Sequence, residues 1–254
     1  MPDTVPYRVT VLLFEGVEEL DAFGPWETLR FWQELTDRDV VVRTASLDGG
    51  PVRCSLGLAV TPDGAVDDGP RPDLLIHPGG CGIDHLRNDQ THLARMRSFA
   101  DAGTLLASVC NGALVLAAAG LLAGLPATSH WSVLDDLASF PDVEVRTKQR
   151  WVDAGHIVTS AGISAGIDMA LHLVARVEGA ERPGRWHTCW STRGPTTPTP
   201  RSRPGGQVRQ PGQRVQSAVS RAASMCSAAG RVVGSAVTAM VAARPSSVTA
   251  LRVV

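Results

Sequence analysis

The chain of 254 residues is 44% hydrophobic and has a formal net charge of −1, which suits one α/β core and favours neither nucleic acid nor an anionic membrane as a general partner. We expect no membrane-spanning segment. The five cysteines are irregularly spaced and neither a CxxC pair nor an HExxH motif occurs, so we expect no metal site and a reducing, cytoplasmic compartment.

The N-terminal part of the chain is expected to begin with a buried strand at residues 8–14, RVTVLLF. A helix follows, with apolar residues at helical spacing: Leu29, Phe31, Trp32 and Leu35. Asp21 lies in the connection between this strand and this helix. Residues 40–47 are expected to form a second strand, and residues 52–60 a short hairpin arm. If the first strand is central, Asp21 lies at the carboxyl edge of the sheet, where such folds bind ligands.

A glycine-dense loop follows the third expected strand, residues 73–77. In this loop, PGGCG at 78–82, Gly79 and Gly80 allow backbone N–H groups to approach a ligand closely, as an oxyanion hole requires. A plain tight turn is the alternative. The G-x-G-x-x-G spacing of a dinucleotide site is absent, and we expect no cofactor.

A nucleophile elbow is predicted where the continuous apolar strand 104–109 meets Cys110 and an Ala- and Leu-rich helix at 111–119, capped by Gly120. The thiolate is the reactive form of cysteine, and a helix N-terminus stabilises negative charge. We therefore expect the pKa of Cys110 to lie well below the ordinary value of about 8.5. Free cysteine is also among the most buried residue types, so a packed, unreactive thiol remains the alternative.

The remaining elements complete an alternation of strands and helices. Helices are expected at 91–102, 133–140 and 164–177, and three short strands at 143–146, 150–153 and 156–160. This alternation predicts an α/β protein, a flavodoxin-like three-layer sandwich with a mainly parallel sheet and a nucleophile elbow.

The composition changes abruptly after residue 181. All 25 acidic residues lie within residues 1–181, whereas eleven of the 24 Lys and Arg residues lie within residues 182–254, so residues 1–181 carry a net charge of about −12. Residues 182–254 contain one Leu and no Lys, Ile, Phe, Tyr or Asn. The loss of whole residue classes, lysine included, favours a GC-rich gene read in a shifted frame over a basic arm for nucleic acid. We expect residues 1–181 to form the α/β domain and 182–254 to form a disordered or aberrant tail.

Five segments, in order along the chain from about residue 8 to residue 178, resemble the ThiJ/PfpI family, whose members are glutamine-amidotransferase-like α/β proteins. The segments are VLLFEGVEELDAFGP at 11–25, IHPGGCG at 76–82, SVCNGALVLAAAGLL at 108–122, ATSHW at 127–131 and TSAGISAGIDMAL at 159–171. The closest resemblance is to the isonitrile hydratases.

This resemblance implies that Cys110 is the nucleophile and Asp21 the acidic partner that hydrogen-bonds the sulfur. Asp21 should then be partly protonated, because two negative charges in contact are disfavoured. The residue after the nucleophile is Thr in the hydratases and Asn111 here. His130 matches a histidine that some relatives place near the cysteine, and a helix-capping or core histidine is the alternative.

The implied reaction is the hydration of a small isonitrile to an N-substituted formamide, with backbone N–H groups near Gly79, Gly80 and Asn111 stabilising developing charge. Trp26 and Trp131 either line an apolar pocket or pack in the core. The family also implies a homodimer.

Two other functions remain open from the sequence. The same domain serves as the N-terminal sensor of AraC-type transcription regulators, in which a helix-turn-helix region follows. The tail lacks such an apolar helical pattern, so we do not expect the chain as given to bind DNA. The third function is that of a redox or aldehyde-detoxifying thiol protein, which would act on glyoxals rather than isonitriles.

Overall fold

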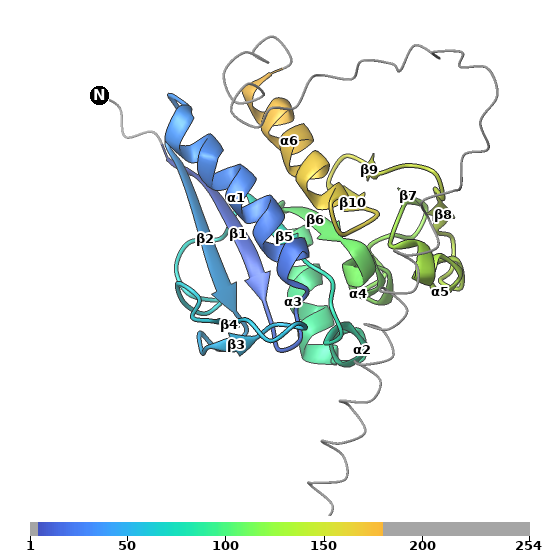
Figure 1. The fold of residues 1–254 in the computed structure, drawn as a ribbon. Helices are drawn as coiled ribbons and strands as arrows, with labels where there is room; N and C mark the ends of the chain where they lie inside the picture. Colours follow the sequence, from blue (N-terminus) through green and yellow to red (C-terminus); the bar gives the residue numbers. More distant parts are fainter. Residues whose placement is uncertain (1–4, 180–254) are drawn as a thin grey trace, which may run out of the picture. The chain divides into compact units, whose positions relative to one another are not determined.

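The computed structural model describes residues 5–179 (Figure 1), and the tail expected at 182–254 lies outside these residues. The centre of the fold is a six-stranded sheet with the strand order β2-β1-β5-β6-β10-β9. The strands are β1 Tyr7–Leu13, β2 Val40–Ser46, β5 Leu74–His77, β6 Leu105–Val109, β9 Trp151–Asp153 and β10 Ile157–Ser160. All neighbours in this sheet pair in parallel except β9, which runs antiparallel to β10 at the edge. The predicted mainly parallel α/β sandwich is confirmed.

Helices cover both faces of the sheet, and this explains the apolar strand sequences. All four residues of β5 and of β10 are buried, as expected for central strands of a parallel sheet. Helices α1 (Glu19–Leu35) and α6 (Ala165–Glu178) lie side by side on one face, and α3 (Gln90–Asp101) and α4 (Ala113–Ala118) lie on the other (Figure 1). Among the described residues no helix combines the length and apolar character needed to cross a membrane.

The close packing of α1 and α6 depends on two glycines. A Cβ atom at Gly24 would lie 3.0 Å from Ile167 Cγ1, and one at Gly166 would lie 3.0 Å from Val109 Cγ1. Because neither glycine carries a side chain, both helices approach each other directly above the end of β6. This contact brings the start of α1 next to the residue that follows β6, which is Cys110.

The smaller elements refine several sequence expectations. The expected hairpin is formed by β3 (Val52–Arg53) and β4 (Ala59–Val60), while β7 (Pro126–Ala127) and β8 (Glu144–Val145) form a separate parallel pair outside the main sheet. Two short helices, α2 (Ile83–Leu86) and α5 (Leu134–Ala138), complete the described elements. The helix expected at 111–119 instead begins as a 3-10 turn, Cys110–Gly112, before α4. Asp21 lies in the first turn of α1 rather than in the connection before it.

The carboxylate of Glu178, the last residue of α6, joins that helix to the end of α1. It accepts hydrogen bonds from Trp32 Nε1 and from Thr36 Oγ1, both at 2.7 Å. Trp32 is 2% exposed, and a buried indole N–H needs an acceptor such as this one.

We predict that Glu178→Ala lowers the free energy of unfolding by about 1–3 kcal/mol, because the substitution leaves a buried donor without a partner. Urea denaturation measures this change. Glu34→Ala is the matched control: Glu34 pairs with Arg30 on an exposed face of α1, and its loss should cost less than about 0.5 kcal/mol. Equal effects of the two substitutions would contradict the assigned role of Glu178.

Candidate active site

The backbone at the end of β6 turns sharply at Cys110. Its φ of 57° is positive, which is uncommon for a residue other than glycine and indicates a local conformational cost. The hydroxyl of Ser129 donates a 2.7 Å hydrogen bond to the carbonyl of Cys110 and stabilises this turn. The predicted sharp strand-to-helix turn at Cys110 is therefore present, with the thiol at the carboxyl end of the sheet; its nucleophilic role stays a prediction. Ser129 itself was not predicted from the sequence.

Backbone segments from two neighbouring strands pack directly against the elbow. A Cβ atom at Gly162, in the loop between β10 and α6, would lie 2.9 Å from Cys110 Sγ. One at Gly79, in the loop after β5, would lie 2.8 Å from Cys110 Cβ and 2.8 Å from Asp21 Oδ2. Both loops can approach so closely only because these residues are glycines. Gly162 was missed as a site residue, although it belongs to the segment TSAGISAGIDMAL.

The carboxyl group of Asp21 is completely buried beside Cys110. Neither of its oxygens has a hydrogen-bond partner of ordinary geometry among the described residues. Burial, and then the charge of Glu18, raise its pKa from the usual 3.8 to about 8, although the Cys110 thiol and the Gly79 N–H act in the opposite direction. Asp21 therefore holds a proton at neutral pH. This agrees with the expected partial protonation.

The expected lowering of the Cys110 pKa is wrong. Burial, followed by the charge that develops on Asp21, raises the pKa of the thiol well above its ordinary range, and the backbone N–H of Asn111 opposes this only in part. The helix behind the sulfur is also short, since a 3-10 turn precedes the six residues of α4. Cys110 and Asp21 thus form a coupled pair, and the loss of a proton by one group disfavours its loss by the other.

The side chain of Asn111 binds the glycine loop. Its Nδ2 donates to the Gly80 carbonyl at 3.1 Å, and the Gly80 N–H donates to its Oδ1 at 2.9 Å. This pair of bonds corrects one expectation, because the Gly80 N–H is not free to stabilise charge on a substrate. The N–H groups of Gly79 and Asn111 remain directed at the Asp21–Cys110 pair.

His130 caps the 3-10 turn Trp131–Val133. Its Nδ1 lies 2.7 Å from Ser132 Oγ, its ring packs against Trp131, and burial lowers its pKa. These contacts match the capping alternative rather than a third member of the catalytic pair. Trp131 is 55% exposed and so is not a core residue, whereas Trp26 is half-buried.

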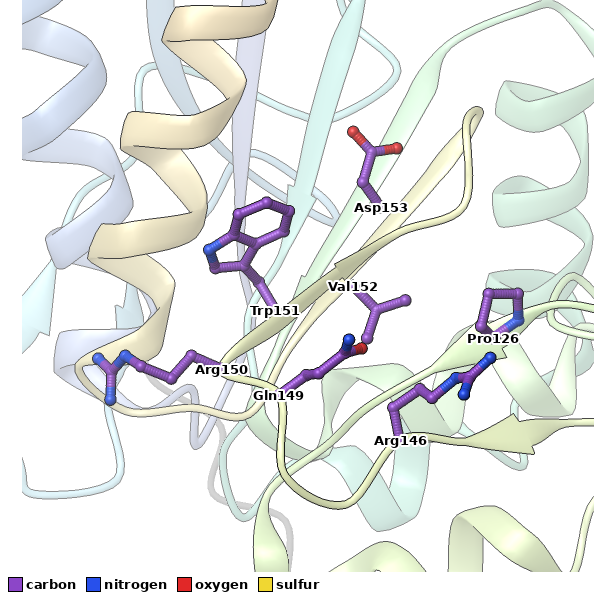
Figure 2. Close-up of a pocket in the computed structure, with 7 residues that line it drawn as sticks. All are labelled: Pro126, Arg146, Gln149, Arg150, Trp151, Val152 and Asp153. Carbon is purple, nitrogen blue, oxygen red and sulfur yellow. The ribbon is translucent and has the colours of Figure 1, made fainter. Parts of the chain in front are cut away.

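A separate cavity of about 660 Å³ lies beside β9 (Figure 2). Its lining contains none of the predicted site residues and consists of Pro126, Arg146, Gln149, Arg150, Trp151, Val152 and Asp153. The guanidinium groups are already engaged, Arg146 with Glu144 and Arg150 with Asp168. The candidate chemistry therefore lies at the elbow rather than in this cavity. Across residues 5–179, no three His, Cys, Asp or Glu side chains are placed to hold a metal ion.

Comparison with known proteins agrees with this geometry. A model of the DJ-1/PfpI family matches residues 7–176. An isonitrile hydratase from Pseudomonas putida is 38% identical over 174 residues, covering 68% of this chain and 73% of that protein. The crystal structure of a ThiJ/PfpI family protein from Pseudomonas syringae superposes with a TM-score of 0.68 at 28% identity, covering 89% of this chain and 90% of that one.

A second kind of relative is longer. The HTH-type transcriptional regulator GbdR of Pseudomonas aeruginosa is 35% identical over 178 residues, which are 69% of this chain and 48% of the regulator. The chain thus spans about half the length of this relative.

We predict that Asp21→Asn stabilises the protein above pH 4. The native wild-type protein must keep Asp21 protonated until about pH 8, whereas the unfolded chain releases that proton near 3.8, so wild-type stability falls across this interval. An amide cannot ionise. The advantage of the variant should be absent at pH 3 and reach at most about 5 kcal/mol at pH 8.

Urea denaturation at a series of pH values measures this difference. Asp101→Asn is the control. The side chain of Asp101 is exposed, so this substitution should leave the pH dependence of the free energy of unfolding unchanged. An Asp21→Asn advantage that did not grow with pH would show that the native carboxyl is already ionised.

We predict that Gly162→Ala displaces the elbow, since its new methyl group would overlap Cys110. Gly155→Ala is a matched control. Both glycines have a positive φ, 91° at Gly155 and 72° at Gly162, but a Cβ atom at Gly155 would meet open space. The Gly162 variant should be less stable than the Gly155 variant by at least about 1 kcal/mol and should alkylate more slowly at Cys110. Similar behaviour of the two variants would mean that only backbone strain matters.

Proposed function

The chain belongs to the DJ-1/PfpI family, and from this premise we propose that it catalyses the hydration of isonitriles to N-substituted formamides, with Cys110 as nucleophile and Asp21 as proton carrier. One observation carries the proposal: a buried carboxyl group, with its pKa raised to about 8, lies beside a thiol on a strained elbow. A carboxyl group of this kind can both give and take a proton near neutral pH. The relationship to the hydratase supports the choice of substrate class.

In the first half of the reaction, the sulfur of Cys110 attacks the terminal carbon of R–N≡C. A carbon–sulfur bond forms, and one π bond between carbon and nitrogen is lost. The former isonitrile carbon takes up a proton from Asp21, which receives the thiol proton in turn. The product is a thioimidate, R–N=CH–S–Cys110.

In the second half, water adds to the thioimidate carbon while the nitrogen gains a proton through Asp21. The carbon–sulfur bond then breaks, the carbonyl of R–NH–CHO forms, and the thiolate recovers its proton. One water is consumed and the enzyme is unchanged. The N–H groups of Gly79 and Asn111 stabilise the charge that develops at the reacting atoms.

A ligand-sensing function is the second candidate, and the similarity to GbdR favours it. A sensor needs binding but no covalent step, so it would not depend on the sulfur of Cys110. Removal of this sulfur should therefore abolish isonitrile hydration but should leave ligand binding by a sensor in place.

We propose that the protein acts as a cytoplasmic homodimer on a small molecule. Two apolar side chains along α1, Leu20 and Leu35, are 42% and 39% exposed and offer a surface for a second copy. The interface of a homodimer would cover them.

We predict that Cys110→Ala lowers the rate of isonitrile hydration by about 10³-fold or more while leaving the thermal unfolding temperature nearly unchanged, since the substitution removes only one partly buried sulfur atom. Gas chromatography of the formamide measures turnover. Cys81→Ala is the control, because the exposed thiol of Cys81 contacts Ser55 and the Gly16 carbonyl and has no part in the proposed reaction.

Three outcomes separate the candidates. Activity retained in Cys110→Ala would disprove covalent catalysis. Isonitrile binding without turnover in the wild-type protein would favour the sensor, and turnover of glyoxals but not isonitriles would favour an aldehyde-detoxifying enzyme.

A further inference from the structure

Two buried histidines, which the proposed reaction does not use, lie directly behind the glycine loop. His77 ends β5 and His92 lies in the first turns of α3; they are 1% and 0% exposed. Their Nε2 atoms lie 2.9 Å apart, and His77 Nδ1 lies 2.9 Å from the carbonyl oxygen of Pro78. The pair thus connects α3 with the first residue of the loop.

The hydrogen bonds determine where each proton lies. A carbonyl oxygen only accepts, so His77 Nδ1 carries a proton and donates to Pro78. Burial lowers the pKa of His77 to about 4, and the ring is therefore neutral with Nε2 as an acceptor. His92 Nε2 must then donate to it. His92 Nδ1 is left as a bare acceptor, in agreement with its lack of a partner among the described residues.

His92 also remains neutral. Burial and the neighbouring groups His77, Arg95 and His85 lower its pKa to about 3, against the opposing charge of Asp89. A neutral His92 carries a single ring proton, and this proton lies on Nε2. The N–H at this position keeps Nε2 of His77 unprotonated and thereby fixes the tautomer of His77.

The geometry of the next peptide bond connects this pair to the candidate active site. The Pro78–Gly79 bond is trans, since the described chain contains no cis peptide, so its C=O and N–H point in opposite directions. His77 holds the C=O. The N–H of Gly79 is thereby directed to the other side, where it acts on Asp21. A glycine has no side chain to oppose rotation of this peptide, so another group must hold it.

We propose that His77 and His92 are positioning residues: His92 fixes the tautomer of His77, and His77 fixes the peptide whose N–H faces the Asp21–Cys110 pair. This inference rests on the proposed role of that pair. It extends that role to two residues that touch neither the thiol nor the carboxyl group.

The test is the pH dependence of Cys110 alkylation by iodoacetamide in the full chain, which requires no isonitrile. His92→Leu removes the donor to His77, so the Gly79 N–H no longer favours the charged form of the pair. The profile should shift to higher pH by about 0.5–1 unit. His92→Gln should restore the wild-type profile, because the amide nitrogen of Gln lies where Nε2 of His lies.

Met96→Ala is the control for a general loss of packing. Met96 is equally buried one turn further along α3, and its substitution should destabilise the protein without moving the alkylation profile. A profile unchanged in His92→Leu, or shifted equally in Met96→Ala, would overturn the inference.

A second pair of variants keeps both side chains polar and decides the question if His92→Leu does not fold. His77→Asn retains an N–H at the position of Nδ1 and should keep the profile. His77→Gln moves the donor towards the position of Nε2, away from Pro78, and should shift it. Equal profiles for these two variants would also overturn the inference. Because alkylation is independent of turnover, failure of isonitrile hydration would leave this test intact.

Discussion

The burial of the Asp21 carboxyl group against the thiol of Cys110 is the constraint on which the rest of the site depends. Both groups gain charge when they lose a proton, and their burial disfavours that charge. They therefore retain protons beyond their ordinary pKa values and titrate as a pair. Because burial disfavours the charged forms of both groups, the pair lowers the free energy of unfolding at pH values where the unfolded chain would ionise. Shifted pKa values of this kind are typical of functional sites.

The fold makes this contact possible by removing side chains where three segments meet. Gly79, Gly162 and Gly166 let the loop after β5, the loop after β10 and the start of α6 approach the elbow. The positive φ of Cys110 adds a local cost at the same point. The parallel sheet and the packing of α1 on α6 supply the stability that maintains this strained junction.

Hydrogen bonds from outside the reacting pair orient its surroundings. Ser129 holds the carbonyl of Cys110, and the amide of Asn111 binds both the N–H and the C=O of Gly80. His77 holds the carbonyl of Pro78 from the opposite side of the loop. Side chains on two sides of the glycine loop, Asn111 and His77, thus hold its backbone. This leaves the Gly79 N–H as the backbone donor facing Asp21.

The sequence by itself determined the alternation of strands and helices, the parallel sheet and the elbow at Cys110, because these follow from local apolar patterns and from chain order. It also placed Asp21 and Gly79 at one sheet edge. Only the tertiary structure decided the direction of the Cys110 pKa, the engagement of the Gly80 N–H and the capping role of His130. These depend on desolvation and on hydrogen bonds between residues far apart in the chain, which no local pattern encodes.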